Sequence, residues 1–513
     1  MQLLYFSPVK FLCLIVWVYS SLYIVQWLQF GAPVPPKYKS IIITISLFFG
    51  PMVLLVLSIG FAVSTIKKAA KSSFTDNIGI KGLIENAISN LRLSLATISK
   101  QQKSKIELVD SSGRSIKDIY HNSSKYKDHS ILELTEQIIA NSLQERASDI
   151  LIDPKDEHYY TVRFRVDGVL RTIQHLDADK SRAVINSIKA ISDMDIAEKR
   201  RPQDGSFIAK TEDKKTASFR VASAGVRNGE KLSIRVLGSN AGLFTLAKTG
   251  LSEKQIKTIK DIIAKPSGMI LMCGPTGSGK TTSLYAMLNE IDLFTRNVIT
   301  VEDPVEYTLQ NASQIEVNPK ADITFAKALR SILRQDPDVI CVGEIRDEET
   351  ASIALRAAQT GHLVLATIHC NSNAASLVRL LDLGISPALM SSGLEVIISQ
   401  RLLRSLCDKC KEPAKLSQSQ IHEFIKNKIN YSNICQAKGC ENCDGTGYYD
   451  RTAIFDILVL DTELKNSIAH SDLTINELKK NGDKKGRSNL YKQGLKKVVS
   501  GITTFDELKR VIG

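Results

Sequence analysis

The chain opens with two long runs of apolar positions, separated by a short polar stretch. Residues 11–30 and 41–63 contain no charged side chain, and the turn-rich sequence APVPPKYKS lies between them. Each run is long enough to span a bilayer as a helix. We therefore predict a transmembrane helical hairpin over residues 1–66, with a kink at Gly50-Pro51. The alternatives are a signal peptide for the first run and a buried core helix for the second, although the first run lacks an early basic cluster.

Lysines near the second run predict the orientation of this hairpin. Lys67, Lys68 and Lys71 follow the run, whereas the preceding loop holds Lys37 and Lys39. Positive charge is enriched on the cytoplasmic side of membrane proteins. The bias is small, and it predicts that the large C-terminal part of the chain lies in the cytoplasm.

The pattern becomes polar over residues 67–128, which are rich in Lys and Ser. Within them, apolar positions recur at helical spacing: Ile80, Leu83, Ile84, Ala87, Ile88 and Leu91. This spacing predicts a short amphipathic helix that lies on the membrane or pairs with a neighbouring subunit, and a helical stalk is the alternative. The whole range is interpreted as a polar linker, and its last part, SSGRSIKDIYHNSSKYKDHS at residues 111–130, reads as flexible.

Residues 129–240 mix helical and alternating patterns. The spacing predicts helices over 131–147 and 180–192. Alternation predicts strands over 218–225 and 230–237, and a hairpin over 159–171 that turns at Asp167-Gly168. We expect a small α+β domain (PAS-like) here, followed by a hinge near residues 238–250.

From residue 252 apolar strands alternate with helices. The predicted strands are GMILMC, RNVITVED, DVICVGE and HLVLATIH, at residues 268–273, 296–303, 338–344 and 362–369. Strands separated by helices form parallel sheets. The fold class is therefore α/β, with a RecA-like core over 241–405. We expect a cysteine-rich element over 406–450 and a helical region over 451–513.

Charge adds a preference for an anionic partner. The 513 residues carry a formal net charge of +13, which favours a membrane surface, a nucleotide or nucleic acid. Aromatic residues make up 6% of the chain, which argues against stacking platforms for single-stranded nucleic acid. Nucleic acid is therefore the least favoured of the three, without being excluded.

The sequence GPTGSGKT follows the first predicted strand and precedes a helical pattern, as a phosphate-binding loop requires. Backbone N–H groups of such a loop surround the β-phosphate. Lys280 would reach the β and γ oxygens, and the Thr281 hydroxyl would ligate Mg²⁺. The residues expected to bind ATP here are Gly274, Pro275, Thr276, Gly277, Ser278, Gly279, Lys280, Thr281 and Thr282.

Carboxylates and a histidine stand at the ends of the later strands. ITVEDPVEY ends a strand with Glu302 and Asp303 and continues to Glu306. Such groups can polarise water or hold a metal, and an acidic loop is the alternative. His369 ends the fourth strand, where it could sense the γ-phosphate, whereas His362 at the other end is less informative. Arg330 and Arg334 share one helix face, and we include Arg330 among the nucleotide-binding residues.

Four of the nine cysteines form two pairs, Cys407-x-x-Cys410 and Cys440-x-x-Cys443, separated by 29 residues. Paired knuckles of this kind bind Zn²⁺ at a closed, structural site. Redox chemistry is the rival interpretation, but no thioredoxin-like pattern surrounds these residues. Cys435 could compete as a ligand, and we expect it to be free.

Together these motifs resemble the secretion ATPase superfamily, specifically the type II secretion and type IV pilus assembly ATPases. The likeness covers residues 131–513 and includes the phosphate loop, ITVEDPVEY, VICVGEIRD and TGHLVLATIHCN. ASDILIDP, RRPQDGS and GLKKVVSGITTFDELKRV also belong to it. The tetracysteine element and the absence of AIRNLIRE favour assembly over retraction ATPases.

The resemblance assigns roles to residues. It implies that Glu306 is the general base and that Glu344 takes part in the magnesium and water network. Arg220 and Arg235 match arginines that reach the γ-phosphate when a subunit closes; ordinary surface arginines on strands are the alternative. The family pattern is broken by Leu151 and by Cys370, which stand where histidine and threonine are usual. A membrane hairpin also replaces the family's soluble N-terminal domain.

The expected function is a membrane-anchored homo-hexameric ATPase that drives assembly of a type IV pilus or a type II secretion pseudopilus. Its expected cofactors are ATP, Mg²⁺ and Zn²⁺, and its expected partner is an inner-membrane platform protein. The expected location is the bacterial inner membrane, with the ATPase domains in the cytoplasm. The rivals are a conjugation or type IV secretion ATPase that moves DNA or effector protein, and a nonhydrolytic nucleotide-dependent scaffold. DNA-stimulated turnover that falls with salt would favour the former, and the carboxylates argue against the latter.

Overall fold

The structure is a computed structural model. It describes residues 106–110, 112–116, 118, 129–211, 216–237, 245–414, 418, 421–422, 431, 433–470 and 490–513. The predicted membrane hairpin over residues 1–66 and the predicted amphipathic helix near residues 80–91 lie outside these residues. None of the helices in the described part of the chain combines the length and hydrophobicity that crossing a bilayer requires.

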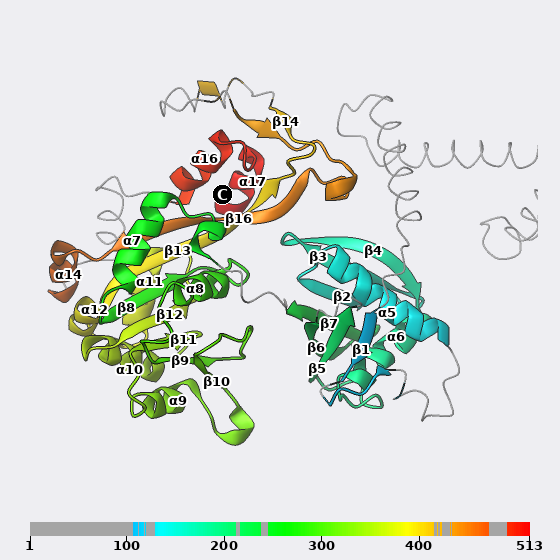
Figure 1. Cartoon of the computed structure of the whole chain (residues 1–513). Helices are drawn as coiled ribbons and strands as arrows, with labels where there is room; N and C mark the ends of the chain where they lie inside the picture. Colours follow the sequence, from blue (N-terminus) through cyan, green and yellow to red (C-terminus); the bar gives the residue numbers. More distant parts are fainter. Residues whose placement is uncertain are drawn as a thin grey trace, which may run out of the picture. The chain divides into compact units, whose positions relative to one another are not determined.

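The small domain is built on a seven-stranded sheet in the order β1-β5-β6-β7-β2-β3-β4 (Figure 1). Every neighbouring pair in it is antiparallel. Its two helices pack against each other and against the sheet. The elements are β1 (Ile106–Val109), α5 (His129–Gln144), β2 (Asp149–Pro154), β3 (Tyr159–Val166), β4 (Val169–Asp177), α6 (Ala178–Ile191), β5 (Gln203–Thr211), β6 (Thr216–Val226) and β7 (Gly229–Leu237).

The predicted helices, the hairpin and the two later strands of this domain are confirmed. The sequence patterns did not reveal β1, β2 or β5. Strand β1 lies within residues that the polarity pattern assigned to the linker, yet Leu108 is fully buried and pairs with Ala209 of β5. A strand of four residues is too short for a polarity pattern to identify, so only its pairing shows it.

The second sheet also has seven strands, in the order β10-β9-β11-β12-β8-β13-β16. The first six are parallel, and β16 joins β13 antiparallel at the edge. The strands are β8 (Gly268–Cys273), β9 (Val298–Glu302), β10 (Ser313–Glu316), β11 (Val339–Val342), β12 (Leu363–Ile368), β13 (Leu394–Leu406) and β16 (Tyr448–Val459). Strands β8, β9, β11 and β12 are the four that the sequence predicted.

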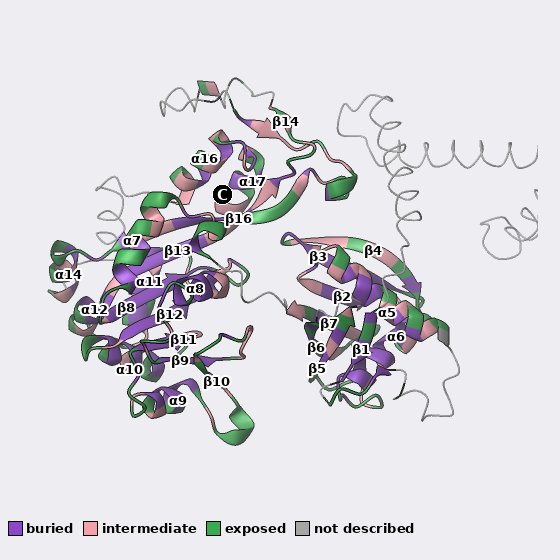
Figure 2. Cartoon of the chain, in the orientation of Figure 1, coloured by how far each residue is buried: buried purple, intermediate pink, exposed green. Residues whose placement is uncertain are grey.

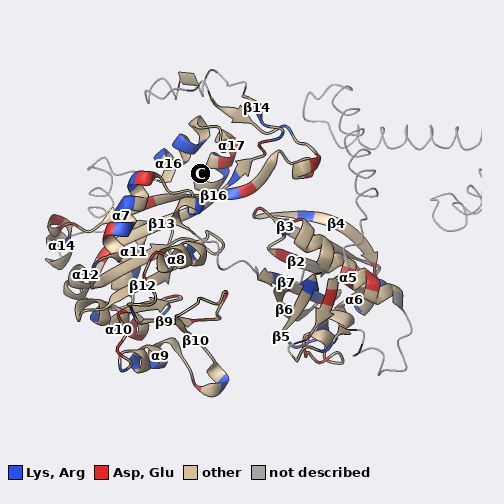
Figure 3. Ribbon diagram, in the orientation of Figure 1, with Lys and Arg blue, Asp and Glu red and all other residues tan. Residues whose placement is uncertain are grey.

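Helices cover both faces of this sheet, because alternate residues of its strands are buried on opposite sides. Met269 and Leu271 of β8 pack with α9, α10, α11, α12 and α14, whereas Ile270 and Met272 pack with α7 and α8. The central strands are accordingly buried in Figure 2 and free of charge in Figure 3. The helices are α7 (Glu253–Ile263), α8 (Lys280–Leu288), α9 (Phe325–Ile332), α10 (Glu348–Gln359), α11 (Asn373–Asp382), α12 (Pro387–Gly393) and α14 (Thr462–Ala469).

The C-terminal residues contribute to a small subdomain that packs on strands β13 and β16. Strands β14 (Glu412–Pro413) and β15 (Cys435–Gln436) form a small ribbon. Helices α16 (Leu490–Val499) and α17 (Phe505–Ile512) pack on β13 and β16 through Leu403, Ile454 and Leu508. Strand β16 lies in the range that the sequence analysis divided between the cysteine-rich element and a helical region.

Candidate nucleotide and catalytic site

The phosphate loop joins the end of β8 to the start of α8. Gly277 and Gly279 have φ values of 75° and 86°, in the left-handed region that favours glycine. A Cβ atom on Gly274 would lie 2.8 Å from the carbonyl oxygen of Gln400, so only glycine fits there. Pro275, Thr276 and Gly277 are exposed at the tip of the loop. The loop therefore has the backbone shape that its sequence predicted.

Lys280 is held against this loop. Its side chain is buried, and its Nζ donates hydrogen bonds to the carbonyl oxygens of Gly274 at 3.0 Å and Pro275 at 3.3 Å. Burial lowers the pKa of Lys280, and the negative charge of Glu344 acts in the opposite direction. A phosphate anion would supply the counter-charge that this buried ammonium group favours.

Glu344 lies two residues after the end of β11, close to two basic side chains. His369 Nε2 lies 3.3 Å from Glu344 Oε2, and Arg346 pairs with the other carboxylate oxygen. Arg346 also lies 3.3 Å from Asp303. Burial lowers the pKa of His369, and the nearby charge of Lys280 lowers it further. Sequence reasoning missed Arg346, although its place two residues after Glu344 puts it at the same sheet edge.

Gly343, the residue before Glu344, lies where β11 comes close to the neighbouring strand β9. A Cβ atom at position 343 would lie 3.2 Å from both the Cα of Glu302 and the carbonyl oxygen of Val301. The Gly343 amide donates to that carbonyl at 2.8 Å. Glycine thus lets β9 and β11 approach closely at their carboxyl ends, and the carboxylate at this edge of the sheet is that of the next residue, Glu344.

Glu306 lies beside the phosphate loop. Burial raises the pKa of its carboxyl group, whereas a hydrogen bond with the Thr281 side chain acts to lower it. A raised pKa brings a glutamate closer to the range in which it can accept a proton from water. The structure therefore brings together Lys280, Thr281, Glu306, Glu344 and His369 at the carboxyl ends of parallel strands.

Glu302 has a different environment from the one that its sequence position suggested. Its buried carboxylate accepts hydrogen bonds from the Tyr285 hydroxyl at 2.6 Å, the Thr300 hydroxyl at 2.7 Å and the Gln314 amide at 3.1 Å. Gln314 also donates to the carbonyl oxygen of Tyr307 at 2.9 Å. Glu302 thus belongs to a protein network next to Glu306, and its oxygens already have protein partners.

The three arginines predicted to bind the nucleotide lie in two different parts of the structure, the RecA-like domain and the small domain. Arg330 lies exposed on α9 and pairs with Glu349 of α10. In the small domain, Arg220 of β6 and Arg235 of β7 are direct partners across the strands. Their side chains therefore extend from the same face of the sheet. Arg235 Nε lies 3.5 Å from Asp149 Oδ1.

Strand β13 contributes two residues that the sequence did not point to. The Gln400 side chain donates to the carbonyl oxygen of Gly279 at 3.1 Å and so supports the phosphate loop. The Arg401 guanidinium donates to the carbonyl oxygen of Asn371, the last residue of the histidine motif, at 2.8 Å. Burial lowers the pKa of Arg401. The sequence analysis did not identify these two residues, because β13 was not among the predicted strands.

The four predicted cysteines converge. The sulfur atoms of Cys407, Cys410, Cys440 and Cys443 all lie within 4.8 Å of one another. Three pairs are separated by 3.9, 3.7 and 3.7 Å, close to the separation of about 3.8 Å expected for a tetrahedral Zn–S₄ site. Amide N–H groups of Cys440 and Gly447 point at the Cys443 sulfur, each at 3.2 Å. Cys435 donates instead to the carbonyl oxygen of Asn433 at 3.5 Å.

Fold and site together define a P-loop nucleotide hydrolase with a RecA-like core. The model of the family described as type II/IV secretion system protein matches residues 124–510. The chain belongs to this family.

Relatives in sequence agree with this assignment. The type II secretion system protein E of Pseudomonas aeruginosa is 41% identical over 384 residues, which cover 75% of this chain and 76% of that protein. The type II secretion system ATPase E of Vibrio cholerae is 40% identical over the same shares of both chains. The type IV pilus assembly ATPase PilB of Acinetobacter baylyi is 39% identical and covers 75% and 67% of the two chains.

Solved structures show the same fold. The pilus retraction motor PilT with bound ADP is similar with a TM-score of 0.50 and 26% identity, over 73% of this chain and 95% of that one. The ATPase DotB of Legionella pneumophila has a TM-score of 0.56 at 22% identity, over 74% and 94%. The chain is therefore an ATP hydrolase of the secretion and pilus assembly class. Such an enzyme requires a nucleotide and Mg²⁺. The four clustered cysteines of this chain could hold a metal ion.

Proposed function

We propose that this protein is a membrane-anchored, homo-hexameric ATPase that powers assembly of a type IV pilus or a type II secretion pseudopilus. One observation carries the proposal: Lys280, Glu306 and Glu344 converge at the carboxyl ends of parallel strands, where such sheets bind ligands. The family supports secretion or pilus assembly as the process. The apolar sequence of residues 1–66 supports anchoring at the bacterial inner membrane, with the ATPase domains in the cytoplasm.

In this proposal each side chain of the site has a separate role in ATP hydrolysis. Lys280 neutralises the β and γ oxygens of ATP, and the glycine-rich loop donates N–H groups to them. Glu306 orients the attacking water and accepts its proton. Glu344 holds His369 and Arg346 in place beside the γ-phosphate. Thr281 would ligate Mg²⁺, which supplies positive charge to the phosphates when it is bound.

Arg220 and Arg235 would couple the nucleotide to movement. Both extend from one face of the small domain, so two positive charges can approach the γ-phosphate together. Loss of the γ-phosphate removes their partner, and the two domains are then free to separate. We propose that this motion pushes on an inner-membrane platform protein.

The tetracysteine cluster would bind Zn²⁺ as a structural site. The sulfur separations fit a tetrahedral ion, and the N–H groups directed at Cys443 stabilise a thiolate. Four protein ligands leave no open position, so this ion takes no part in hydrolysis.

The test of the proposed function is Lys280→Ala in the full chain. Removing the buried ammonium group should lower ATP turnover to the background rate, because the charge at the β and γ oxygens is lost. The control is Lys320→Ala, which removes an exposed lysine from the same domain and should leave turnover unchanged. Thermal unfolding checks that both variants are folded. Wild-type turnover in Lys280→Ala would disprove the assignment of the site.

A further inference from the structure

The small domain contains a pocket that the ATPase chemistry does not use. Its volume is about 550 Å³, within the range of small-molecule sites. Helix α6 supplies Arg182, Ile185 and Asn186, and the loop after it supplies Lys199 and Arg200. The remaining walls come from Tyr160 of β3 and from the hairpin between β6 and β7.

The floor of the pocket is buried and electrically neutral. Glu230, the one carboxylate among the lining residues, is 6% exposed, and its Oε1 lies 2.8 Å from Lys189 Nζ. Lys189 also donates to the carbonyl oxygen of Glu198 at 2.6 Å. Because this lysine is fully buried, the ion pair fixes the 198–200 loop against the hairpin. The floor therefore adds no net charge to oppose an anion.

The rim of the pocket is basic. Lys199, Arg200, Arg227 and Arg182 all line it and are all exposed. Arg182 has a carboxylate partner, Asp179 at 2.7 Å. Within the residues that the structure describes, Lys199, Arg200 and Arg227 have none at ion-pair distance. Positive charges that converge without partners attract a multivalent anion.

The inner end of the pocket holds a hydroxyl group that is available to a ligand. Tyr160 is 1% exposed, and its hydroxyl has no hydrogen-bond partner in the described part of the chain. A Cβ atom on Gly229 would lie 2.1 Å from that hydroxyl, and one on Gly225 would lie 2.8 Å from the carbonyl oxygen of Lys199. Glycine at these positions therefore keeps the hairpin close to the pocket without filling it.

We propose that this pocket binds a phosphate ester. The phosphate would lie between the side chains of Lys199, Arg200 and Arg227, which are suited to its charge and geometry. The organic part would contact Ile185 and Val226, while the Tyr160 hydroxyl and the Glu230 carboxylate offer hydrogen bonds at the inner end. Two sources share this chemistry: a soluble nucleoside phosphate and the headgroup of an anionic phospholipid.

The experiment measures binding to the full chain in two arms. One arm titrates the protein with adenosine 5′-monophosphate by calorimetry; this ligand has no β or γ phosphate for Lys280 to hold. The other arm measures sedimentation with phosphatidylglycerol vesicles and with phosphatidylcholine vesicles. Binding in the first arm identifies a soluble ligand, and preference for phosphatidylglycerol identifies a lipid headgroup.

Matched variants decide whether the pocket is responsible. Lys199→Gln with Arg200→Gln should weaken binding by about tenfold or more at low salt, because two of the charges are lost. Lys155→Gln with Lys210→Gln removes the same charge from exposed positions outside the pocket and should leave binding unchanged. Val226→Glu places a negative charge at a side chain that is 43% exposed, so it should abolish binding and leave the unfolding temperature unchanged. Equal binding by all these proteins, or no binding in either arm, would overturn the proposal.

Discussion

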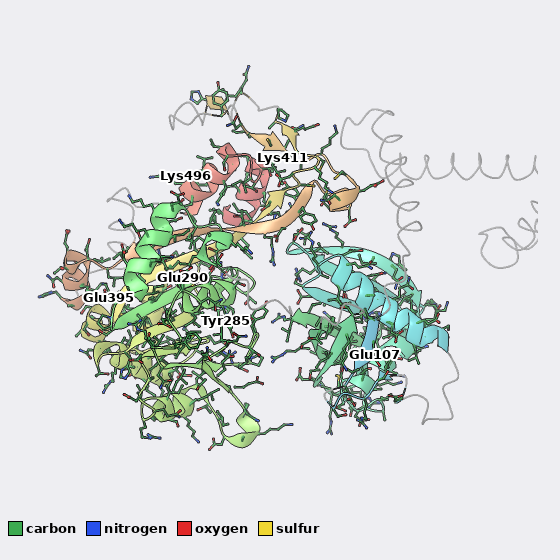
Figure 4. The ribbon with its side chains drawn as sticks, viewed as in Figure 1. Glu107, Tyr285, Glu290, Glu395, Lys411 and Lys496 are labelled. Carbon is green, nitrogen blue, oxygen red and sulfur yellow. The ribbon has the colours of Figure 1, made fainter. Side chains whose placement is uncertain are left out.

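At the scale of single residues, Tyr285 connects the phosphate loop to the catalytic glutamate. It lies on α8, the helix that begins at Lys280, in the interior of the domain (Figure 4). Its hydroxyl donates to Glu302 at 2.6 Å and accepts from Gln314 at 3.2 Å. Burial raises the pKa of the Tyr285 phenol, so the group remains a donor. Because Gln314 also holds the carbonyl oxygen of Tyr307, the network fixes the backbone next to Glu306.

Tyr285→Phe tests this positioning role. The change removes one buried hydroxyl and leaves Glu302 short of a donor, so it should lower the free energy of unfolding by about 1–2 kcal/mol. If the network orients Glu306, kcat should fall by about tenfold while KM stays near the wild-type value. ATPase kinetics and denaturant unfolding measure the two effects.

Tyr448→Phe is the matched control for that prediction. It removes a hydroxyl that lies 2.8 Å from Thr504, away from the phosphate loop, and it should change stability without changing kcat. Identical kcat values for both variants and the wild type would show that the network is structural only.

At the scale of elements, a buried ion-pair network attaches α17 to β13. The Glu507 side chain is fully buried and accepts from Arg404 at 2.7 Å, from Arg510 at 2.7 Å and from the Arg404 amide at 3.0 Å. Burial acts to raise the pKa of Glu507, but the hydrogen bonds from Arg510 and Arg404 outweigh it and lower the pKa. A lowered folded-state pKa stabilises the fold above the unfolded-state pKa, and this stability is lost as the pH falls through the folded-state value.

Glu507→Ala should therefore destabilise the domain strongly at neutral pH. It leaves the partly buried Arg404 without its partner, a loss of about 3 kcal/mol in the free energy of unfolding. Asp506→Ala on the same helix removes an exposed carboxylate and should have little effect. Denaturant unfolding at pH 7 compares the two variants, and similar stabilities would contradict the assigned role. The deficit should shrink in acid, below the pKa of Glu507.

At the scale of the whole molecule, the cysteine cluster brings together segments that lie far apart in the sequence. Cys407 directly follows β13, and Cys443 lies in the turn that leads into β16, which begins at Tyr448 and pairs with β13. The Cys407 amide donates to the carbonyl oxygen of Gly447 at 2.9 Å, closing the base of this segment. A metal bound here would tie the ribbon β14–β15 to the edge of the RecA-like sheet.

Metal analysis of the purified chain should find one Zn²⁺ per chain. Cys440→Ser should lose the ion and make the 407–447 segment sensitive to protease, because three thiolates do not complete the site. Cys435→Ser should keep the ion, since that sulfur lies outside the cluster. Loss of Zn²⁺ from the Cys435 variant alone would mean that the ligand set is wrong.

The sequence by itself determined the parts of this protein whose signals are local. The four central strands, the phosphate loop and the paired cysteines each lie in one short segment, and their residue types dictate both backbone and chemistry. Strand β13 escaped prediction because Ser399, Gln400 and Arg401 interrupt its apolar pattern.

Tertiary structure alone decided which side chains surround the predicted ones. Gln314 reaches Glu302 from a different strand, Gln400 supports a loop more than a hundred positions before it, and Glu349 takes Arg330 as its partner. The basic pocket likewise joins four separate segments of the small domain. Hydrogen bonds and ion pairs depend on distance in space, and spacing along the chain fixes that distance only within one element.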